Sequence, residues 1–272
     1  MPPITPFFSV IITTHLRPAL LQRALLSLRQ QTFQDFEIIV VADTLDAATA
    51  EACARWLRET DSFLKRTGPA GPAASRNLGL ALARGKWVAF LDDDDTFTAE
   101  HLAGAHRVIT QPATEALRQA EVLFSDYAVV TENRAQDPIP VLAHTRVSLR
   151  DQPVANLYVK NFIPNNALLY QRQVLTGCLT DPHLESQEDW DFLLSVCAKA
   201  MPVHYEGGGS VVHKDQHNPG SERGSRPEAQ DANVVVDVLH VFRRWRAPTA
   251  ELRAQRQAVL MSVGLNLPPS LL

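Results

Sequence analysis

The stretch that most constrains the fold runs from Trp87 to Asp95, where five consecutive apolar residues lead directly into four consecutive aspartates. An uninterrupted apolar run of this length is typical of a strand buried on both faces of a parallel sheet. Polar groups at the carboxyl end of such a strand lie at the edge where open α/β sheets bind ligands. The stretch therefore predicts an α/β fold whose ligand site includes these aspartates.

Four adjacent carboxylates repel one another, so an ordered turn of this kind needs positive charge nearby. Asp92 and Asp94 can point the same way in an extended or turning segment, and their hard oxygen atoms suit Mg²⁺ or Mn²⁺, which in turn bind diphosphates. The alternative is an acidic surface turn ahead of a helix that Thr98 caps and that carries Glu100 in its first turn. The motif alone leaves both interpretations open.

Strands and helices alternate in the first third of the chain, with short connections that indicate parallel βαβ units. The expected strands cover residues 7–13, 36–41 and 87–91, with a short extended stretch near 63–64. The expected helices cover residues 20–30, 47–60 and 73–83. No glycine-rich dinucleotide or P-loop motif follows any of these strands, which disfavours both chemistries.

The pattern is less regular after Asp95. Helices are expected at 99–110 and 115–120, strands at 122–130 and 168–170, and an irregular or edge segment at 131–153. A helix at 185–200, a strand at 210–212 and two helices at 229–245 and 249–263 follow. The last two helices have apolar faces that favour packing on the rest of the protein. A dimer contact or a contact with a membrane surface is the alternative for them.

Composition defines the class of protein. A chain of 272 residues with 45% hydrophobic content can bury the core of one large domain with an appendage. A net charge of −4 without a basic run argues against nucleic acid as a partner. Three scattered cysteines fit a reducing compartment, and we find no signal peptide or membrane-spanning apolar run. We therefore expect a cytoplasmic protein, with the inner face of the membrane as a further possibility for its location.

Four motifs resemble the nucleotide-sugar-binding half of family 2 glycosyltransferases. They are Ser9–Pro18, Gln31–Asp43, Gly71–Asn77 and Phe90–Asp95, in the order and spacing of that family. The resemblance implies a GT-A fold, with a Rossmann-like, mostly parallel sheet flanked by helices. It also implies a metal-dependent transfer of a sugar with inversion of its anomeric configuration.

The resemblance divides the chain into a GT-A domain at 1–222 and a C-terminal loop and helical extension at 223–272. Within the domain, residues 7–98 are expected to bind the nucleotide sugar and residues 99–222 the acceptor. The expected partners are a nucleoside-diphosphate sugar, with a UDP-sugar favoured, and a glycan, lipid-linked or small-molecule acceptor. Such reactions belong to polysaccharide, lipopolysaccharide or other glycoconjugate synthesis.

The donor nucleotide is expected to contact Thr13, Asp43, Arg76, Asp92 and Asp93. Asp43 follows the second strand, where a carboxylate can accept the imide N–H of uracil or thymine. The resemblance makes Arg76 a residue that closes the base and phosphate pocket, and Asp92 a contact to ribose. Arg76 is alternatively an exposed helix residue, as most arginines are.

The metal site is expected to centre on Asp94 as the direct ligand of Mn²⁺ or Mg²⁺, with Asp92 as a second ligand and Asp95 in support. His217 fits the family spacing slightly better than His213 as a further ligand, and either can instead be a structural histidine. The ion would neutralise the charge that develops on the leaving nucleoside diphosphate. A loop at 218–227 adds two candidate phosphate contacts, Arg223 and Arg226.

A second acidic cluster, Glu188 and Asp189, lies about a hundred residues after the first. The resemblance makes Asp189 the general base that takes the proton from the acceptor hydroxyl, with Glu188 beside it to raise its pKa. The plainer interpretation is that acids in a first helical turn favour the helix dipole. Asn165 and Asn166 are either contacts to sugar hydroxyls or ordinary turn residues. Trp190 either stacks on a ring of the acceptor or packs in the hydrophobic core.

Two other functions remain open. Ala42, Thr13 and Leu16 stand where the family has an acid, a proline and an asparagine, which bears on base identity and donor affinity. A non-catalytic nucleotide- or sugar-binding module of the same fold is therefore one alternative. A haloacid-dehalogenase-type phosphatase is the other, because Asp92-x-Asp94-x-Thr96 follows an apolar strand, although that motif normally comes early in its domain.

Overall fold

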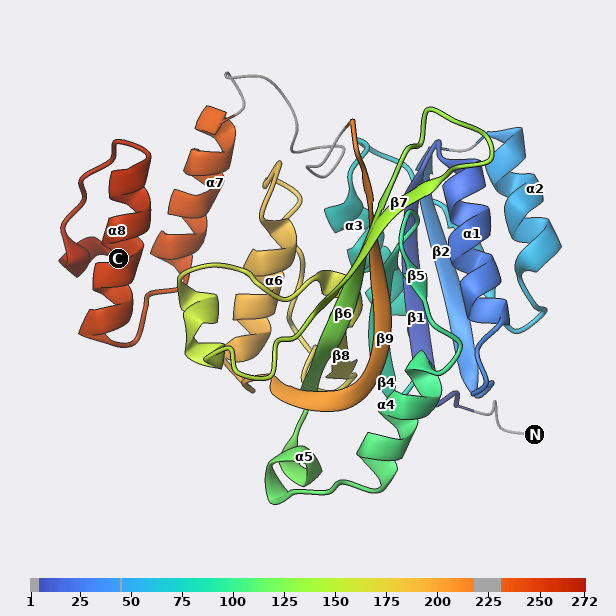
Figure 1. The fold of residues 1–272 in the computed structure, drawn as a ribbon, viewed down its shortest axis with the longest axis horizontal. Helices are drawn as coiled ribbons and strands as arrows, with labels where there is room; N and C mark the ends of the chain where they lie inside the picture. Colours follow the sequence, from blue (N-terminus) through green and yellow to red (C-terminus); the bar gives the residue numbers. More distant parts are fainter. Residues whose placement is uncertain (1–4, 45, 218–230) are drawn as a thin grey trace.

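The computed structural model of this chain describes residues 5–44, 46–217 and 231–272. Its centre is a nine-stranded sheet with the order β3-β2-β1-β4-β8-β6-β9-β5, and β7 pairs with β6 outside this path (Figure 1). The strands are β1 (Phe8–His15), β2 (Phe36–Thr44), β3 (Ser62–Lys65), β4 (Trp87–Asp92), β5 (Thr96–Phe97), β6 (Val122–Glu132), β7 (Val141–Val147), β8 (Leu168–Gln171) and β9 (Val203–Asp215).

Helices cover both faces of this sheet. The α-helices are α1 (Pro18–Arg29), α2 (Ala47–Trp56), α3 (Pro72–Leu82), α4 (His101–Thr110), α5 (Glu115–Gln119), α6 (Glu188–Cys197), α7 (Asp231–Arg244) and α8 (Ala250–Ser262). Three short 3₁₀ helices are η1 (Val154–Tyr158), η2 (Asn165–Ala167) and η3 (Pro269–Leu271). In Figure 1, α1 and α2 lie on one side of the sheet and α6, α7 and α8 on the other.

The first four strands pair in parallel, with β1 between β2 and β4 and with β3 at the edge beside β2. In the second half, β9 runs parallel to β6, while β7 and β8 run antiparallel to it. The predicted α/β fold with a Rossmann-like, mostly parallel sheet is therefore confirmed. The segment expected to be an edge contributes β7, whose side chains are largely exposed.

Strand β1 shows why the sheet is apolar on both faces. Val10 and Ile12 pack into the core cluster that contains residues of α1, α2 and α4, whereas Ile11 packs into the cluster that contains residues of α6 and α7. Each of the three is at most 1% exposed. Because successive side chains of a strand point to opposite faces, a strand covered on both sides carries functional groups only at its ends.

Three of the expected boundaries are wrong. The helix expected to reach residue 60 ends at Trp56, because Leu57 is extended. Helix α4 begins at His101 without a side-chain cap, and Thr98 instead accepts the His101 N–H with its backbone carbonyl. The strand expected at 210–212 is the centre of the longer β9, whose run of three glycines hides the apolar alternation of a strand.

Helices α7 and α8 pack back onto the domain. Phe242 of α7 meets Trp190 of α6 edge to face, with ring centroids 5.7 Å apart. Arg256 of α8 is fully buried and fastens the pair by donating hydrogen bonds to the backbone carbonyls of Tyr158, Phe242, Trp245 and Leu272. The appendage is thus joined to the domain by both apolar and polar contacts.

The expected boundary at residue 222 lies outside the described residues, as do the loop at 218–227 and its Arg223 and Arg226. The boundary between the two halves of the domain stays a prediction. Among the residues that the structure describes, no helix combines the length and the apolar character that crossing a bilayer requires.

Candidate active site

Arg76 of α3 joins the two acidic clusters that are far apart in the sequence. Its Nη2 donates to Asp92 Oδ1 and its Nη1 to Glu188 Oε1, each at 2.9 Å. The Arg76 side chain is 9% exposed, whereas its partners Asp92 and Glu188 are 36% and 17% exposed, so the arginine is buried and the acids are partly open to water. Burial opposes the charge, but the nearby carboxylates of Asp92, Glu188 and Asp189 raise the pKa of Arg76 above its usual value. The carboxyl end of β4 and the N-terminus of α6 therefore form one site.

Asp189 lies in the first turn of α6. Its Oδ1 accepts the Trp190 N–H at 2.7 Å, and its Oδ2 lies 3.4 Å from Asn161 Nδ2. Burial, followed by the negative charge of Glu188, raises the pKa of Asp189 to about 6. A carboxylate that titrates closer to neutral pH is a stronger general base than an ordinary aspartate. Asp189 can therefore accept a proton at neutral pH.

The aspartates at the end of β4 differ in their exposure. The side chain of Asp92 is 36% exposed and that of Asp94 21%, whereas Asp93 and Asp95 are buried. Asp93 pairs with Arg17, and its Oδ2 has no hydrogen-bond partner among the described residues. Burial raises the pKa of Asp93 to about 6, although Arg17 opposes this shift. The alternative of an acidic turn on the surface is therefore wrong.

Arginines surround Asp94. Its Oδ2 accepts from Arg17 Nη1 at 3.3 Å and from Arg134 Nη1 at 3.2 Å, and its backbone carbonyl accepts from Arg23 at 2.7 Å. Glu132, which is buried at the end of β6, accepts from Arg23 at 2.7 Å and from Arg134 at 2.8 Å. Guanidinium groups thus supply positive charge that the acidic turn requires.

His213 lies against Glu132. Its Nδ1 is 3.0 Å from Glu132 Oε2 and its Nε2 is 2.9 Å from Thr96 Oγ1. Burial opposes ionisation of Glu132, but hydrogen bonds from two arginines lower its pKa to about 2. An ionised carboxylate only accepts, so the His213 Nδ1–H donates and the Nε2 accepts from the threonine hydroxyl. His217 is exposed, and its ring accepts from the Gln216 side chain at 2.9 Å.

The implied metal ion can be compared with this set of donors. Among the described residues, no group of three or more His, Cys, Asp or Glu side chains is arranged to hold a metal. Mg²⁺ is usually bound through one or two carboxylates and completed by substrate phosphates and water. Asp92 and Asp94 offer such oxygen atoms beside the unpartnered Oδ2 of Asp93, so they fit an ion whose coordination the donor diphosphate completes. Neither His213 nor His217 contacts Asp92 or Asp94.

The expected nucleoside contacts lie along the same edge of the sheet. Asp43, at the end of β2, accepts from His15 Nδ1 at 2.6 Å and from the Gly71 N–H at 2.8 Å. Thr13 lies opposite the last residue of β4 in the register of β1 and β4. Arg66 is buried and donates hydrogen bonds to the backbone carbonyls of Pro69 and Gly71, which holds in place the loop whose Gly71 N–H contacts Asp43. Asp43, His15 and Gly71 thus meet at the carboxyl ends of β1 and β2.

Two non-glycine residues with left-handed backbone angles flank the site. Leu16 has a φ of 51° and lies between His15 and Arg17, and Gln187 has a φ of 59° immediately before Glu188. Such conformations cost on the order of 1 kcal/mol in ordinary residues and cluster at functional sites. They turn the chain so that Arg17 reaches the aspartates and α6 begins at the acidic pair.

The expected acceptor contacts have other roles. Trp190 is 2% exposed, and its Nε1 donates to the Leu157 carbonyl at 2.7 Å. Asn166 is 1% exposed and donates to Asp95 Oδ2 at 2.9 Å. Both predicted sugar contacts are wrong, because neither side chain has surface left for a ligand. Asn165 is also buried, as the first residue of η2.

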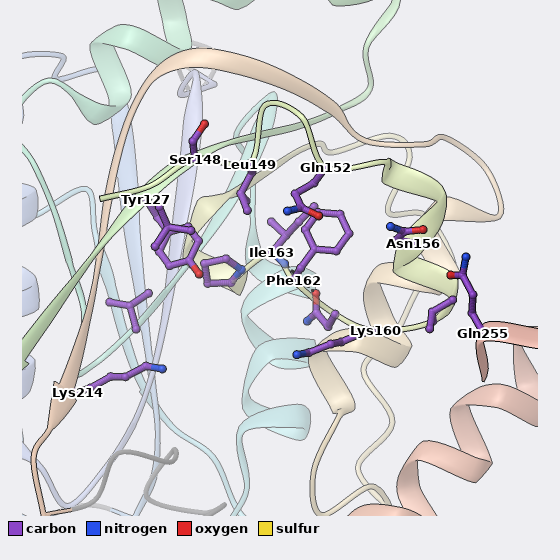
Figure 2. Close-up of a pocket in the computed structure, with 15 residues that line it drawn as sticks. Tyr127, Ser148, Leu149, Gln152, Asn156, Lys160, Phe162, Ile163, Lys214 and Gln255 are labelled. Carbon is purple, nitrogen blue, oxygen red and sulfur yellow. Dashed lines mark hydrogen bonds between the residues drawn. The ribbon is translucent and has the colours of Figure 1, made fainter. Parts of the chain in front are cut away.

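Figure 2 shows a cavity of about 730 Å³. Aromatic and aliphatic side chains, among them Tyr127, Phe162 and Ile163, line it together with several polar groups. Asn161, whose amide lies 3.4 Å from Asp189 Oδ2, is one of the lining residues. None of the three expected acceptor contacts lines this cavity.

Sequence reasoning missed the residues that support the acids, namely Arg17, Arg23, Glu132, Arg134 and Asn161. Arg17 lies in the first motif directly after a strand, where sheet-edge ligands are expected, so its position was a usable signal. Glu132 and Arg134 lie just beyond the expected end of the strand at 122–130, so an accurate boundary would have indicated them. Nothing local marks Arg23 or Asn161.

Comparisons with known proteins find glycosyltransferases. Residues 9–117 match the family model "Glycosyl transferase family 2". A Campylobacter jejuni protein named GalNAc(5)-diNAcBac-PP-undecaprenol beta-1,3-glucosyltransferase is 38% identical over 113 residues, which cover 40% of this chain and 35% of that protein. The putative colanic acid biosynthesis glycosyl transferase WcaA of Escherichia coli is 24% identical over 214 residues, which cover 76% of this chain and 72% of WcaA.

Solved structures share the fold. TarS of S. aureus in complex with UDP-GlcNAc has a TM-score of 0.67 at 20% identity, over 93% of this chain and 71% of the TarS chain. The mannosyltransferase PcManGT from Pyrobaculum calidifontis, in complex with GDP-Man and Mn²⁺, has a TM-score of 0.54 at 15% identity, over 99% and 79% of the two chains. The matched part spans 35%, 44% and 31% of the length of three curated relatives. The resemblance to family 2 glycosyltransferases is therefore confirmed over residues 9–117, and the chain as a whole shares the GT-A fold.

Proposed function

We propose that this chain transfers a sugar from a nucleoside-diphosphate sugar to an acceptor hydroxyl, with inversion, in the synthesis of a glycoconjugate. The observation that supports this most directly is the double ion pair of Arg76 with Asp92 and Glu188. It brings the strand-end acids and the general-base candidate Asp189 into one site. Inverting transfer needs a carboxylate on the face opposite the leaving group, and the presence of two distinct acidic clusters in one site supports these separate roles.

The donor nucleoside would lie against Thr13 and Asp43, with Arg76 and Asp92 on the ribose and phosphate side. Asp43 accepts from His15 and Gly71 in this structure, and it could accept an imide N–H of the base in place of the His15 contact. This supports a UDP-sugar. The similar folds of TarS, named as a complex with UDP-GlcNAc, and PcManGT, named as a complex with GDP-Man, support a nucleoside diphosphate in general.

Asp94 and Asp92 would hold Mn²⁺ or Mg²⁺. When bound, the ion supplies positive charge that stabilises the leaving diphosphate. Arg17 and Arg134 both donate to the Asp94 carboxylate that would bind the ion. Their guanidinium groups therefore also lie near the place where the leaving diphosphate would gain negative charge. Asp93 and Asp95 orient the turn from the protein side, since both are buried.

Asp189 would accept the proton of the attacking acceptor hydroxyl. Burial and the negative charge of Glu188 raise the pKa of Asp189, and Arg76 holds the Glu188 side chain in place by donating a hydrogen bond to it. Asn161 lies between Asp189 and the cavity, from which an acceptor can approach. The GT-A fold makes the phosphatase alternative wrong, because that enzyme class has a different arrangement around its nucleophile.

Titration calorimetry with UDP, GDP and dTDP, each with and without Mn²⁺, tests the donor site. We expect UDP to bind in a metal-dependent way, and Asp94→Asn to weaken its binding by at least about tenfold. Glu115→Gln, which changes an exposed acid on α5, serves as the matched control. Failure of all three diphosphates to bind would contradict the proposal.

Release of UDP from UDP-sugars then separates an enzyme from a binding module. A glycosyltransferase releases UDP slowly to water even without its acceptor, whereas a non-catalytic module binds the donor and leaves it intact. We expect metal-dependent release with one UDP-sugar in a panel.

A further inference from the structure

The cavity beside Asp189 has a charge opposite to that of the protein as a whole. Among the residues that the structure describes, fifteen line it, and the charged ones are Lys160 and Lys214. No acid is among them, although the chain carries a net charge of −4. A cavity that is lined by cations and amides in an acidic protein is suited to a negatively charged ligand.

Strand β9 separates this cavity from the acid cluster. Alternate residues of a strand point to opposite faces. His213 faces Glu132 and Thr96 in the acid cluster, whereas Val212 and Lys214, its neighbours on either side, line the cavity. The positive charge of Lys214 is therefore directed to the cavity rather than to the acids.

The two ammonium groups are available to a ligand. Lys160 and Lys214 are exposed, and neither pairs with a carboxylate in the part of the chain that the structure describes. The Lys199 ammonium group, in contrast, donates hydrogen bonds to the backbone carbonyls of Val174 and Thr176. In Figure 2 the Lys160 and Lys214 side chains extend toward each other from opposite walls.

The rest of the lining suits a sugar ring. Tyr127, Phe162 and Ile163 form an apolar wall, and Asn156 and Gln152 add amide groups. Small-molecule sites commonly combine an apolar surface with a few polar groups that fix orientation. An aromatic ring can cover the apolar face of a sugar while the amides contact its hydroxyls.

We propose that this cavity receives the acceptor and that Lys160 and Lys214 select an acceptor that carries a phosphate or a carboxylate beside its sugar ring. The inference rests on the proposed function, because it is the acceptor hydroxyl that must reach Asp189. Asn161 belongs to the cavity lining and lies 3.4 Å from Asp189, so a ring in the cavity borders the general base.

The test measures binding of three probes to the protein in the presence of UDP and Mn²⁺. They are methyl glucoside 6-phosphate, methyl glucuronide and methyl glucoside, which share a ring and differ in charge. We expect at least one charged probe to bind about tenfold more tightly than the neutral one, the size expected of a charge-assisted hydrogen bond. The two charged arms distinguish a phosphate from a carboxylate.

The double variant Lys160→Gln, Lys214→Gln should lose this preference, and the matched control Lys65→Gln, at the far edge of the sheet, should keep it. UDP affinity of each variant verifies that its donor half is folded. Equal binding of charged and neutral probes, binding of none, or an unchanged preference in the double variant would each overturn the inference. Loss of UDP binding by the wild-type protein would instead contradict the proposed function.

Discussion

The acid cluster at the end of β4 and the cavity beside Asp189 differ in whether their cationic side chains form ion pairs within the protein. In the cluster, Arg17, Arg76 and Arg134 all pair with carboxylates of the protein. In the cavity, Lys160 and Lys214 pair with no carboxylate among the described residues. Internal pairs hold the donor side in shape before a ligand arrives, whereas unpaired lysines leave their interaction for the ligand. If the proposed roles hold, the donor site is preorganised and the acceptor site depends on its ligand for its ion pairs.

The largest expected effect comes from breaking the pair that joins the two acidic clusters. Arg76→Met leaves Asp92 and Glu188 facing each other without a shared cation. Because Arg76 is buried while Asp92 is partly exposed, its removal should cost about 2 kcal/mol in free energy of unfolding, measured by urea denaturation. Arg118→Met is the control, because that arginine is 67% exposed and its loss should cost less than about 0.5 kcal/mol. Equal losses in both variants would show that Arg76 does not hold the site together.

The pH dependence of turnover tests whether Asp189 belongs to the same preorganised site. Its pKa is raised from 3.8 to about 6, so the base is lost as pH falls through about 6. We expect kcat/KM for UDP release to fall about tenfold per pH unit below that point. Glu188→Gln removes a negative neighbour and should move the midpoint to lower pH. A midpoint that stays fixed in this variant would contradict the coupling of the two acids.

Metal affinity in the absence of donor probes the arginines around Asp94. Arg134→Met removes a cation from the Asp94 carboxylate and should tighten Mn²⁺ binding by up to about tenfold, the equivalent of about 1.4 kcal/mol. Arg23→Met serves as the matched control. Arg23 also pairs with Glu132, but it donates to the backbone carbonyl of Asp94 and not to the carboxylate. Calorimetric titration of both variants with Mn²⁺ measures the difference. Tighter binding in Arg23→Met alone would contradict competition at the carboxylate.

The smallest expected effect concerns strain on the donor side. Leu16 has a φ of 51° and is 49% exposed, so it gains little from burial. Asparagine tolerates this conformation better than leucine, and Leu16→Asn should raise the free energy of unfolding by about 0.5 kcal/mol. Leu16→Ala keeps the cost of the backbone angle and should not stabilise. Equal thermal midpoints for the two variants would contradict the presence of strain.

The sequence was most informative where local pattern and chemistry coincide. Strands β1, β2 and β4 are apolar along their length because both faces are covered, so their extent and the acids at their ends could be predicted. The convergence of Asp92 with Glu188 came from the family resemblance, since no local pattern relates residues so far apart. The structure adds the physical link, Arg76.

The acceptor side could not be predicted in the same way. Its cavity is formed by side chains from β6, β9, η1 and the segment before η2, which come together only in the folded chain. Trp190 and Asn166 have side chains typical of sugar contacts, but packing against Phe242 and a bond to Asp95 bury them. Exposure depends on tertiary contacts, and residue type alone does not report it.

The substitution Asp189→Asn tests the central claim, that the acids of β4 and α6 form one active site with separate roles. We expect UDP affinity within about twofold of the wild-type value and UDP release from the donor sugar reduced at least about a hundredfold. Unchanged UDP release, or loss of UDP binding together with activity in a folded variant, would contradict it.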